Sequence, residues 1–500
     1  MNKDIYKKKI AVIGAGWYGC HLALSLKKAG YDVVLYEKNH EIFSQISGKF
    51  GIRLHAGPHY PRSAKTRESC RRGAAAFKTS YPDLVIPHEY SIYGLGITDA
   101  DDKPSRTNQK DFERICKESD PEHYKKINLE AYGYEGLHSA YSVDESSIAV
   151  GNRLRSKFKE YLHAAGIEVR CDFEVTKLDP KDSKIIVGND SSNEAFDKVI
   201  NTTSYQAFNK KDKDQQFPFD MEAIYQPCLA LIYKDNTPGK HPFSFIVMDG
   251  WFPCLMPFIE NEESTPTSRK YILTHGKWTI MGSYDAPTKA KNVLSNIDNS
   301  FIEEAIKPLS EKEMLRFWPK FKERFTYVGW QGEVIAKLKT KREFRSAVTY
   351  EKDMIIHVIP GKVSNIFDVE NEMFALLYKK NILQREGYLY AAKGSLDESF
   401  SEIIEKPAIG EPNTSNLQTY DELKPKSTFT GIYSFLLQCI ANLLEWSLIH
   451  AAILVNSMKE LSASITKAIT VVRNRYNMFS CNIEFSVKII EEPPVDTLSI

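Results

Sequence analysis

The chain has 500 residues, of which 42% are hydrophobic and 26% charged, with 66 Lys and Arg against 65 Asp and Glu. This composition excludes a disordered or collagen-like polymer, and the balanced charge gives no case for a nucleic-acid partner. The eight cysteines form no C-x-x-C pair, so we predict no metal site. No apolar signal region is visible near the N-terminus, which predicts a cytoplasmic location with reduced thiols.

The chain begins with a predicted strand, glycine turn, helix and second strand. Residues 9–13 (KIAVI) form a short apolar run, GAGWYG follows, and DVVLYE ends at Glu37. Gly14, Gly16 and Gly19 make a G-x-G-x-x-G pattern between the strand and the helix. Such glycines permit a tight turn, close approach of a pyrophosphate, and packing of the helix on the strand. The pattern therefore predicts a dinucleotide site.

Other residues of this unit are also expected to contact the dinucleotide. Trp17 and Tyr18 open the helix, whose N-terminus offers unpaired N–H groups and a partial positive charge to phosphates. Glu37, followed by Lys38, lies where a carboxylate can accept hydrogen bonds from ribose hydroxyls. The spacing alone does not distinguish FAD from NAD, because both cofactors share the ADP half.

Residues 51–63 (GIRLHAGPHYPRS) concentrate polar side chains around proline and glycine. Arg53, His55, His59 and Arg62 all lie in this stretch. The prolines and glycine fix the backbone, so several of these side chains can point at one place. A functional cluster is the favoured interpretation, because so many donors are costly to bury without a purpose. The alternatives are a surface loop whose arginines pair with carboxylates, and a metal site at the histidines without acidic or thiol support.

The remaining sequence divides by its hydrophobic pattern. A helical stretch stops at a glycine and is followed by the strand IEVRCDFEV and the buried strand of FDKVINTTSY. A strand-rich stretch comes next and predicts an antiparallel sheet. The predicted segments are 1–100 and 140–205 as the two parts of the dinucleotide domain, 206–350 as a substrate or cap domain, 351–383 as the closing strand and helix, 384–428 as a linker, and 429–500 as a helical extension.

Over roughly residues 8–380, this order of elements resembles the D-amino-acid-oxidase-like (DAO) branch of the FAD-dependent oxidoreductases. Three segments carry the resemblance: KEYLHAAGIEVRCDFEV, VINTTSY and TKREFRSAVTYEKDMIIHVIPGKVSNIFDVENEM. The resemblance implies an α/β fold, in which a Rossmann-type FAD-binding domain holds an inserted antiparallel-sheet substrate domain, plus a helical C-terminal extension. It also implies FAD as cofactor, contacted by Val175, Thr202, Gly361, Lys362 and Arg53.

The activity that this resemblance implies is oxidation of a C–N or C–O bond of a small substrate, which can be anionic. The enzyme would be an amine or amino-acid oxidase or dehydrogenase, and hydride would pass from the substrate to the flavin. In such an enzyme the loop after the second strand passes the flavin ring. Arg62 or Arg345 would then orient an anionic group, and His55 or His59 would accept a proton or stabilise charge.

Two alternatives remain open. The His-x-Gly-x-His spacing of residues 55–59 is similar to a stretch in the UDP-galactopyranose mutases, which are redox-neutral flavoenzymes acting on a sugar nucleotide. Arg53 and Arg62 would then hold the diphosphate. The other alternative is a flavin-binding adaptor whose C-terminal helix recruits a partner.

The C-terminal segment has apolar residues that alternate by four and three from Leu454 to Val472. A buried helix is the favoured interpretation, and a helix for oligomerisation or a protein partner is the second. Membrane association through residues 429–457 is not favoured, because polar residues such as Glu445 and His450 interrupt the apolar run.

Overall fold

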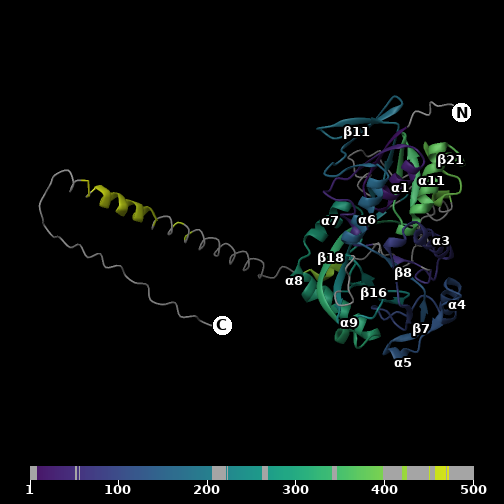
Figure 1. Cartoon of the computed structure of the whole chain (residues 1–500). Coiled ribbons are helices and arrows are strands. Elements are labelled where there is room, and N and C mark those ends of the chain that lie inside the picture. Colours follow the sequence, from purple (N-terminus) through teal and green to yellow (C-terminus); the bar gives the residue numbers. More distant parts are fainter. Residues whose placement is uncertain are drawn as a thin grey trace, which may run out of the picture. The chain divides into compact units, whose positions relative to one another are not determined.

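The computed structural model describes residues 8–50, 53–55, 57–204, 221, 223–261, 269–339, 346–397, 419–424, 447, 450, 456–468 and 470–471. It divides the chain into two compact units, Met1–Lys424 and Pro425–Ile500. In the first unit, a mainly parallel sheet with helices α1 and α11 lies above a second sheet that includes β16 and β7 (Figure 1).

The first sheet has eight strands and forms the centre of a Rossmann-type domain. Five of its strands, β20, β13, β1, β2 and β9, pair in parallel, and the antiparallel strands β19, β22 and β21 extend the sheet beyond β20. In strand order, the bounds are β21 (Ile382–Arg385), β22 (Tyr388–Ala391), β19 (Val348–Lys352), β20 (Ile355–Ile359), β13 (Lys198–Asn201), β1 (Lys9–Ile13), β2 (Asp32–Tyr36) and β9 (Glu168–Arg170).

The apolar sequence of β1 follows from burial on both faces of this sheet. Ile10 and Val12 pack into a core shared with α1 (Trp17–Lys28), α6 (Gly151–Ala164) and α11 (Ile366–Tyr378). Ala11 and Ile13 point to the opposite face, because successive side chains of a strand alternate. There they meet a meander of β10 (Lys177–Lys181), β11 (Lys184–Gly188) and β12 (Asn193–Phe196).

The second large sheet is antiparallel except for one pair, β15 with β5. Buried aromatic and aliphatic side chains pack one face against α9 (Lys307–Phe317). In strand order, the bounds are β18 (Phe325–Leu338), β14 (Ala223–Asp235), β17 (Lys270–His275), β16 (Pro253–Phe258), β15 (Ser244–Met248), β5 (Ser91–Gly96), β7 (Leu137–Val143) and β6 (Lys125–Lys126).

A small sheet and several short elements complete the first unit. The sheet is formed by β3 (Arg53–Leu54), β8 (Ser146–Ile148) and β4 (Val85–Pro87), in the order β3-β8-β4. The other elements are α2 (Ile46–Lys49), α3 (Ala64–Ser80), η1 (Pro82–Leu84), α4 (Gln109–Ser119), α5 (Leu129–Tyr132), α7 (Pro287–Ser295), α8 (Asn299–Phe301), η5 (Ile302–Ile306), α10 (Phe321–Arg324), η6 (Val363–Asn365) and α13 (Thr419–Leu423).

Some strands pair outside the segments that were predicted for their sheets. β5 belongs to the substrate sheet, although it lies within the predicted FAD segment 1–100. β19 belongs to the FAD sheet, although most of it falls within 206–350, and β22 adds a strand to that sheet inside the predicted linker 384–428. Hydrophobic alternation indicates a strand but does not say which sheet it joins, since that depends on distant partners.

In the second unit, residues 456–468 and 470–471 are helical. Met458, Leu461 and Ile465 are exposed on this helix at the predicted spacing. Most of the stretch 429–457 lies outside the described residues. Among the helices that the structure does describe, none is long and apolar enough to cross a membrane. A protein partner at this helix stays a prediction.

Glu372, on α11, makes the stability of the first unit depend on pH. Its side chain is buried and accepts hydrogen bonds from the Ser395 backbone N–H, at 2.6 Å, and from the Ser395 hydroxyl. Burial raises the pKa of this carboxyl from 4.5 to about 7. Between these values the folded protein binds more protons than the unfolded chain, so its free energy of unfolding falls as the pH rises.

We expect Glu372→Gln to remove this slope, which amounts to about 3 kcal/mol across the window. Urea unfolding on both sides of the window, at pH about 4.5 and about 8, measures the difference. The exposed Glu130→Gln is the matched control and should retain the slope. Parallel stability curves for Glu372→Gln and the parent protein would contradict the assignment.

Candidate active site

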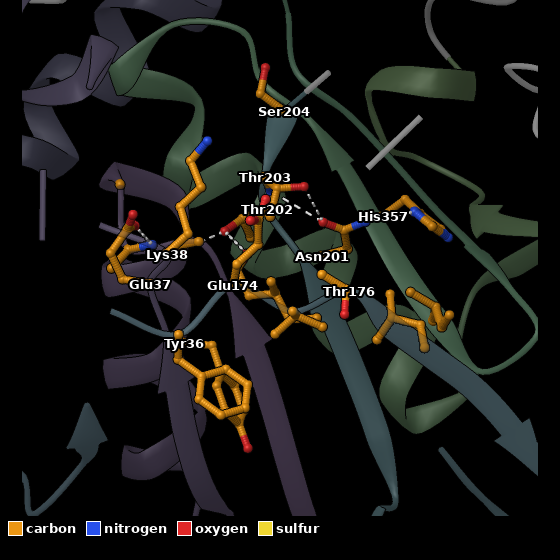
Figure 2. Close-up of a pocket in the computed structure, with 18 of the residues that line it drawn as sticks. Tyr36, Glu37, Lys38, Glu174, Thr176, Asn201, Thr202, Thr203, Ser204 and His357 are labelled. Atoms are coloured by element: carbon orange, nitrogen blue, oxygen red, sulfur yellow. Dashed lines mark hydrogen bonds between the residues drawn. The ribbon is translucent and has the colours of Figure 1, made fainter. Parts of the chain in front are cut away.

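A cavity of about 520 Å³ opens where β1, β2 and β13 end (Figure 2). Glu37 and Lys38 lie on one side of it, Thr202 near the middle and His357 on the far side (Figure 2). Ligands of open α/β sheets bind at this edge, outside the carboxyl ends of the parallel strands. The cavity brings together six of the residues predicted to contact the cofactor: Gly14, Gly16, Glu37, Lys38, Val175 and Thr202.

The glycine turn leaves no room for side chains. Gly14 has φ +96°, and its N–H donates to the Tyr36 carbonyl at 2.8 Å. A Cβ on Gly19 would lie 1.8 Å from the Gly14 oxygen, and one on Gly16 would lie 2.8 Å from the Ser47 Oγ. The Thr202 hydroxyl closes the turn by donating to the Gly14 carbonyl at 2.9 Å. This cradle at the start of α1 fits a pyrophosphate.

The Glu37 carboxylate is held at the edge of the cavity. Its Oε2 accepts from the Ala15 N–H at 2.9 Å, and its Oε1 accepts from the backbone and side chain of Asn39 at 3.0 and 2.6 Å. Each carboxylate oxygen can accept about two hydrogen bonds, so Oε2 retains capacity for a ribose hydroxyl. Val175 lines the same cavity.

The two aromatic residues that open α1 have different surroundings. The Trp17 ring is buried in an aromatic core, with Phe43, Phe77 and Phe158 at centroid distances of 5.3, 5.1 and 5.1 Å. The ring therefore serves the core, and a cofactor contact of Trp17 stays a prediction for its backbone at the start of α1. The Tyr18 hydroxyl instead fixes the closing turn: it accepts from the Gly361 N–H at 3.1 Å and donates to the Lys362 carbonyl at 2.6 Å.

Burial raises the pKa of the Tyr18 phenol, which therefore remains a donor. Tyr18→Phe leaves the Gly361 N–H and the Lys362 carbonyl without this partner, so we expect a loss of about 1–3 kcal/mol in the free energy of unfolding. FAD should bind about tenfold more weakly, as the turn loosens. Equilibrium dialysis and urea unfolding measure both effects, with the exposed Tyr132→Phe as control. Unchanged values in both measurements would contradict the clamp.

Arg53, from the predicted loop, is buried on β3 and reaches into the substrate sheet. Its guanidinium donates to the Met256 Sδ at 3.0 and 2.9 Å, and its Nη1 lies 2.9 Å from the His59 Nδ1. Sulfur is a weak acceptor. Behind it, the buried Glu145 carboxylate accepts from the Tyr93 hydroxyl at 2.8 Å. The Arg53 guanidinium is thus held in place, although the Met256 sulfur that accepts two of its hydrogen bonds is a weak acceptor.

Three rings and a lysine adjoin this guanidinium. The rings of His55 and His59 stack at 4.7 Å, the Tyr60 ring meets both edge-on, and the Lys362 Nζ lies 3.7 Å from the Tyr60 centroid. The His55 Nδ1 is buried, and no described residue hydrogen-bonds to it. Burial and the nearby charges of Lys362 and Arg53 hold the pKa of His55 well below its usual value. Burial and Arg53 likewise lower the pKa of Lys362.

Of the two arginines predicted to hold the substrate, the structure describes only Arg62. The Arg62 Nε donates to the Asp249 Oδ2 at 2.9 Å, so Arg62 forms an ion pair as the surface-loop alternative expects. Arg345 lies outside the described residues. Reasoning from the sequence missed Asp249, Met256, Tyr93 and Glu145, which lie outside any motif and reach the loop only through sheet pairing.

A phosphate cradle on a parallel sheet, together with a buried cationic cluster (Arg53, Lys362, His55 and His59) that contacts an antiparallel sheet, defines a dinucleotide-dependent enzyme of two domains. The family model for FAD dependent oxidoreductases (DAO) matches residues 9–338, so the chain belongs to this family. The resemblance, the fold class and the FAD cofactor predicted from the sequence are thereby confirmed: the protein is a FAD-dependent oxidoreductase.

Individual proteins are similar to this chain in sequence or in fold. The chain is 45% identical to the FAD-dependent monooxygenase kojA of Aspergillus flavus over 421 residues, covering 83% of this chain and 97% of the relative. Glycine oxidase from Geobacillus kaustophilus has a similar fold, with a TM-score of 0.54 at 12% identity, over 75% of this chain and 95% of that one. The L-alpha-glycerophosphate oxidase of Mycoplasma pneumoniae with FAD bound gives 0.54 at 13%, over 74% and 94%.

Proposed function

We propose that this protein oxidises a C–N or C–O bond of a small anionic substrate. The supporting observation is the buried cluster of Arg53, Lys362, His55 and His59, in which burial and the charge of Arg53 lower the pKa of both Lys362 and His55. A site that gathers positive charge away from water is stabilised by a ligand that brings negative charge. Bound FAD would supply the two-electron acceptor.

Each part of the site has a proposed task. Gly14, Gly16 and Gly19 would hold the pyrophosphate, and Glu37 would hold the ribose. The turn at Gly361 and Lys362, together with Arg53, would lie against the flavin. With these assignments, the cationic cluster would lie beside the flavin, which gains negative charge when the substrate is oxidised.

His55 is the proposed proton acceptor. Oxidation of an H–C–O–H or H–C–N–H unit removes a hydride from carbon and a proton from oxygen or nitrogen. Its low pKa keeps His55 neutral, and its unpaired Nδ1 can receive the proton. An anionic group held by Arg53 and Lys362 would raise the pKa of His55 and so strengthen it as a base.

Pairs of candidate substrates test the proposal. Hydroxy acids and amino acids are compared with their neutral amides, using the holoenzyme and an artificial electron-accepting dye. For the substrate that is oxidised, we expect removal of the negative charge to lower kcat/KM by at least about tenfold. Equal values for an acid and its amide would contradict an anion-selective site.

Oxygen insertion is the second candidate, because the relative at 45% identity is called a FAD-dependent monooxygenase. Insertion of one oxygen atom requires O₂ and two further electrons, supplied by a reductant such as NADH or NADPH, and releases water. Consumption of NAD(P)H that depends on substrate, with isotopically heavy oxygen from O₂ found in the product, would favour this candidate. Oxidation without any nicotinamide, and without oxygen from O₂ in the product, would exclude it.

A further inference from the structure

An ion pair connects the His–Arg loop of the FAD domain to the substrate sheet. Arg62 ends the turn of residues 57–62, and Asp249 directly follows β15. The Arg62 Nε and the Asp249 Oδ2 are 2.9 Å apart, and the two side chains are 44% and 8% exposed. The buried Asp249 therefore belongs to the substrate sheet, and the half-exposed Arg62 belongs to the FAD domain.

Asp249 is a rigid anchor. Its Oδ2 also accepts from the Thr107 hydroxyl at 3.0 Å, and its own N–H donates to the Ser105 Oγ at 3.3 Å. The Arg106 N–H donates to the Asp249 carbonyl at 3.1 Å. Side chain and backbone are thus both fixed by the segment 105–107, so the carboxylate cannot follow Arg62 if the loop moves.

The loop is also held from its other flank. The Arg67 Nη1, on α3, donates to the carbonyls of Tyr60 and Pro61 at 3.1 and 2.8 Å. The Tyr60 N–H donates to the Gly57 carbonyl at 3.0 Å and closes the turn. His59 and Tyr60 adjoin these attachments in the chain: both rings contact His55, and the Tyr60 ring also contacts Lys362.

We propose that Asp249 is a positioning residue that, through Arg62, holds the turn 57–62 so that His59 and Tyr60 complete the cationic cluster. The inference rests on the proposed function only for its effect on turnover. The inference differs from the prediction that Arg62 binds the substrate directly. If Arg62 bound the substrate, replacing Asp249 would not be expected to have the same effect as replacing Arg62. The two residues should behave as one unit.

The test combines Asp249→Asn, Arg62→Gln, the double variant and Asp249→Glu in the full-length holoenzyme. Asp285→Asn is the control, because Asp285 forms an exposed ion pair with Lys289 at 2.8 Å. Hydrogen exchange of peptides covering 57–62 reports the attachment without reference to activity. We expect faster exchange in both single variants, with kcat lowered about 10- to 100-fold and KM changed little. The double variant should be no worse than either single one, and Asp249→Glu should restore part of kcat.

Two outcomes would overturn the inference. In the first, Arg62→Gln raises KM without changing kcat, while Asp249→Asn behaves like the parent protein. This result would indicate that Arg62 contacts the substrate directly. The other is unchanged exchange in Arg62→Gln, whose half-exposed side chain can be replaced even if Asp249→Asn fails to fold. Faster exchange with unchanged kinetics would instead contradict the proposed function, because the loop would then be attached as inferred but remote from the reaction.

Discussion

The Gly19→Ala variant is expected to be purified without FAD. A Cβ at this position would lie 1.8 Å from the Gly14 oxygen and 2.8 Å from the Thr202 Oγ1. The first of these atoms belongs to the backbone and cannot move aside, so α1 must shift away from the cradle. Overpacking of this kind costs about 1–3 kcal/mol or more, which corresponds to a loss in FAD affinity of about 5- to 150-fold or more when it falls on the binding groups. The absorbance of bound flavin in the purified protein measures the result.

Gly30→Ala is the matched control for Gly19→Ala. Gly30 also lies at an end of α1 and has φ +95°, but a Cβ there would meet nothing within 4 Å. This control should lose about 1 kcal/mol of stability through backbone strain and should retain FAD. If Gly19→Ala bound FAD as well as Gly30→Ala does, the glycine turn could not be the phosphate cradle.

The second large effect is expected from Arg53→Met, which removes the central cation of the cluster at little cost in volume. The new side chain would lie beside Met256 and Cys254. Loss of a group that stabilises developing charge costs about 100- to 1,000-fold in turnover, so kcat/KM should fall by that factor. FAD affinity should change by less than about tenfold, because the cradle at α1 is untouched.

The pH profile provides a second measurement on Arg53→Met. Arg53 is one of the charges that hold the pKa of His55 below its usual value. Removing it raises the pKa of His55, so protonation disables the base at a higher pH and the acidic limb of the rate profile moves upward. Arg316→Met is the control, since Arg316 pairs with Glu313 within the substrate domain. If kcat/KM and the acidic limb of the rate profile were both unchanged in Arg53→Met, Arg53 would not be part of the active site.

The sequence predicted those parts of the site that are local in the chain. Gly14, Gly16, Gly19 and Glu37 lie within thirty residues, and their spacing follows from how a strand, a turn and a helix bind a diphosphate. Arg53, His55 and His59 were found in the same way, since their density in one short loop is itself a signal. The structure adds that Lys362, which is more than three hundred residues away, contacts the neighbouring Tyr60 ring.

The missing parts depend on pairing between distant segments. Asp249 and Met256 reach the loop because β15 and β16 occupy particular places in the second sheet, and no local pattern gives the order of strands. The packing of the Trp17 ring also depends on distant segments, because the ring lies in a core built from α3 and α6. The His-x-Gly-x-His resemblance to the mutases does not extend to the family model, which assigns the chain to the DAO oxidoreductases.

The central claim is that the substrate itself delivers electrons to FAD beside the cationic cluster. Anaerobic mixing of the holoenzyme with its substrate, without any nicotinamide, tests it most directly through the visible absorbance of FAD. We predict that the flavin is bleached by the substrate alone, and that Arg53→Met slows this bleaching about 100-fold or more. A flavin that stays oxidised with substrate but is bleached by NADH or NADPH would contradict the claim.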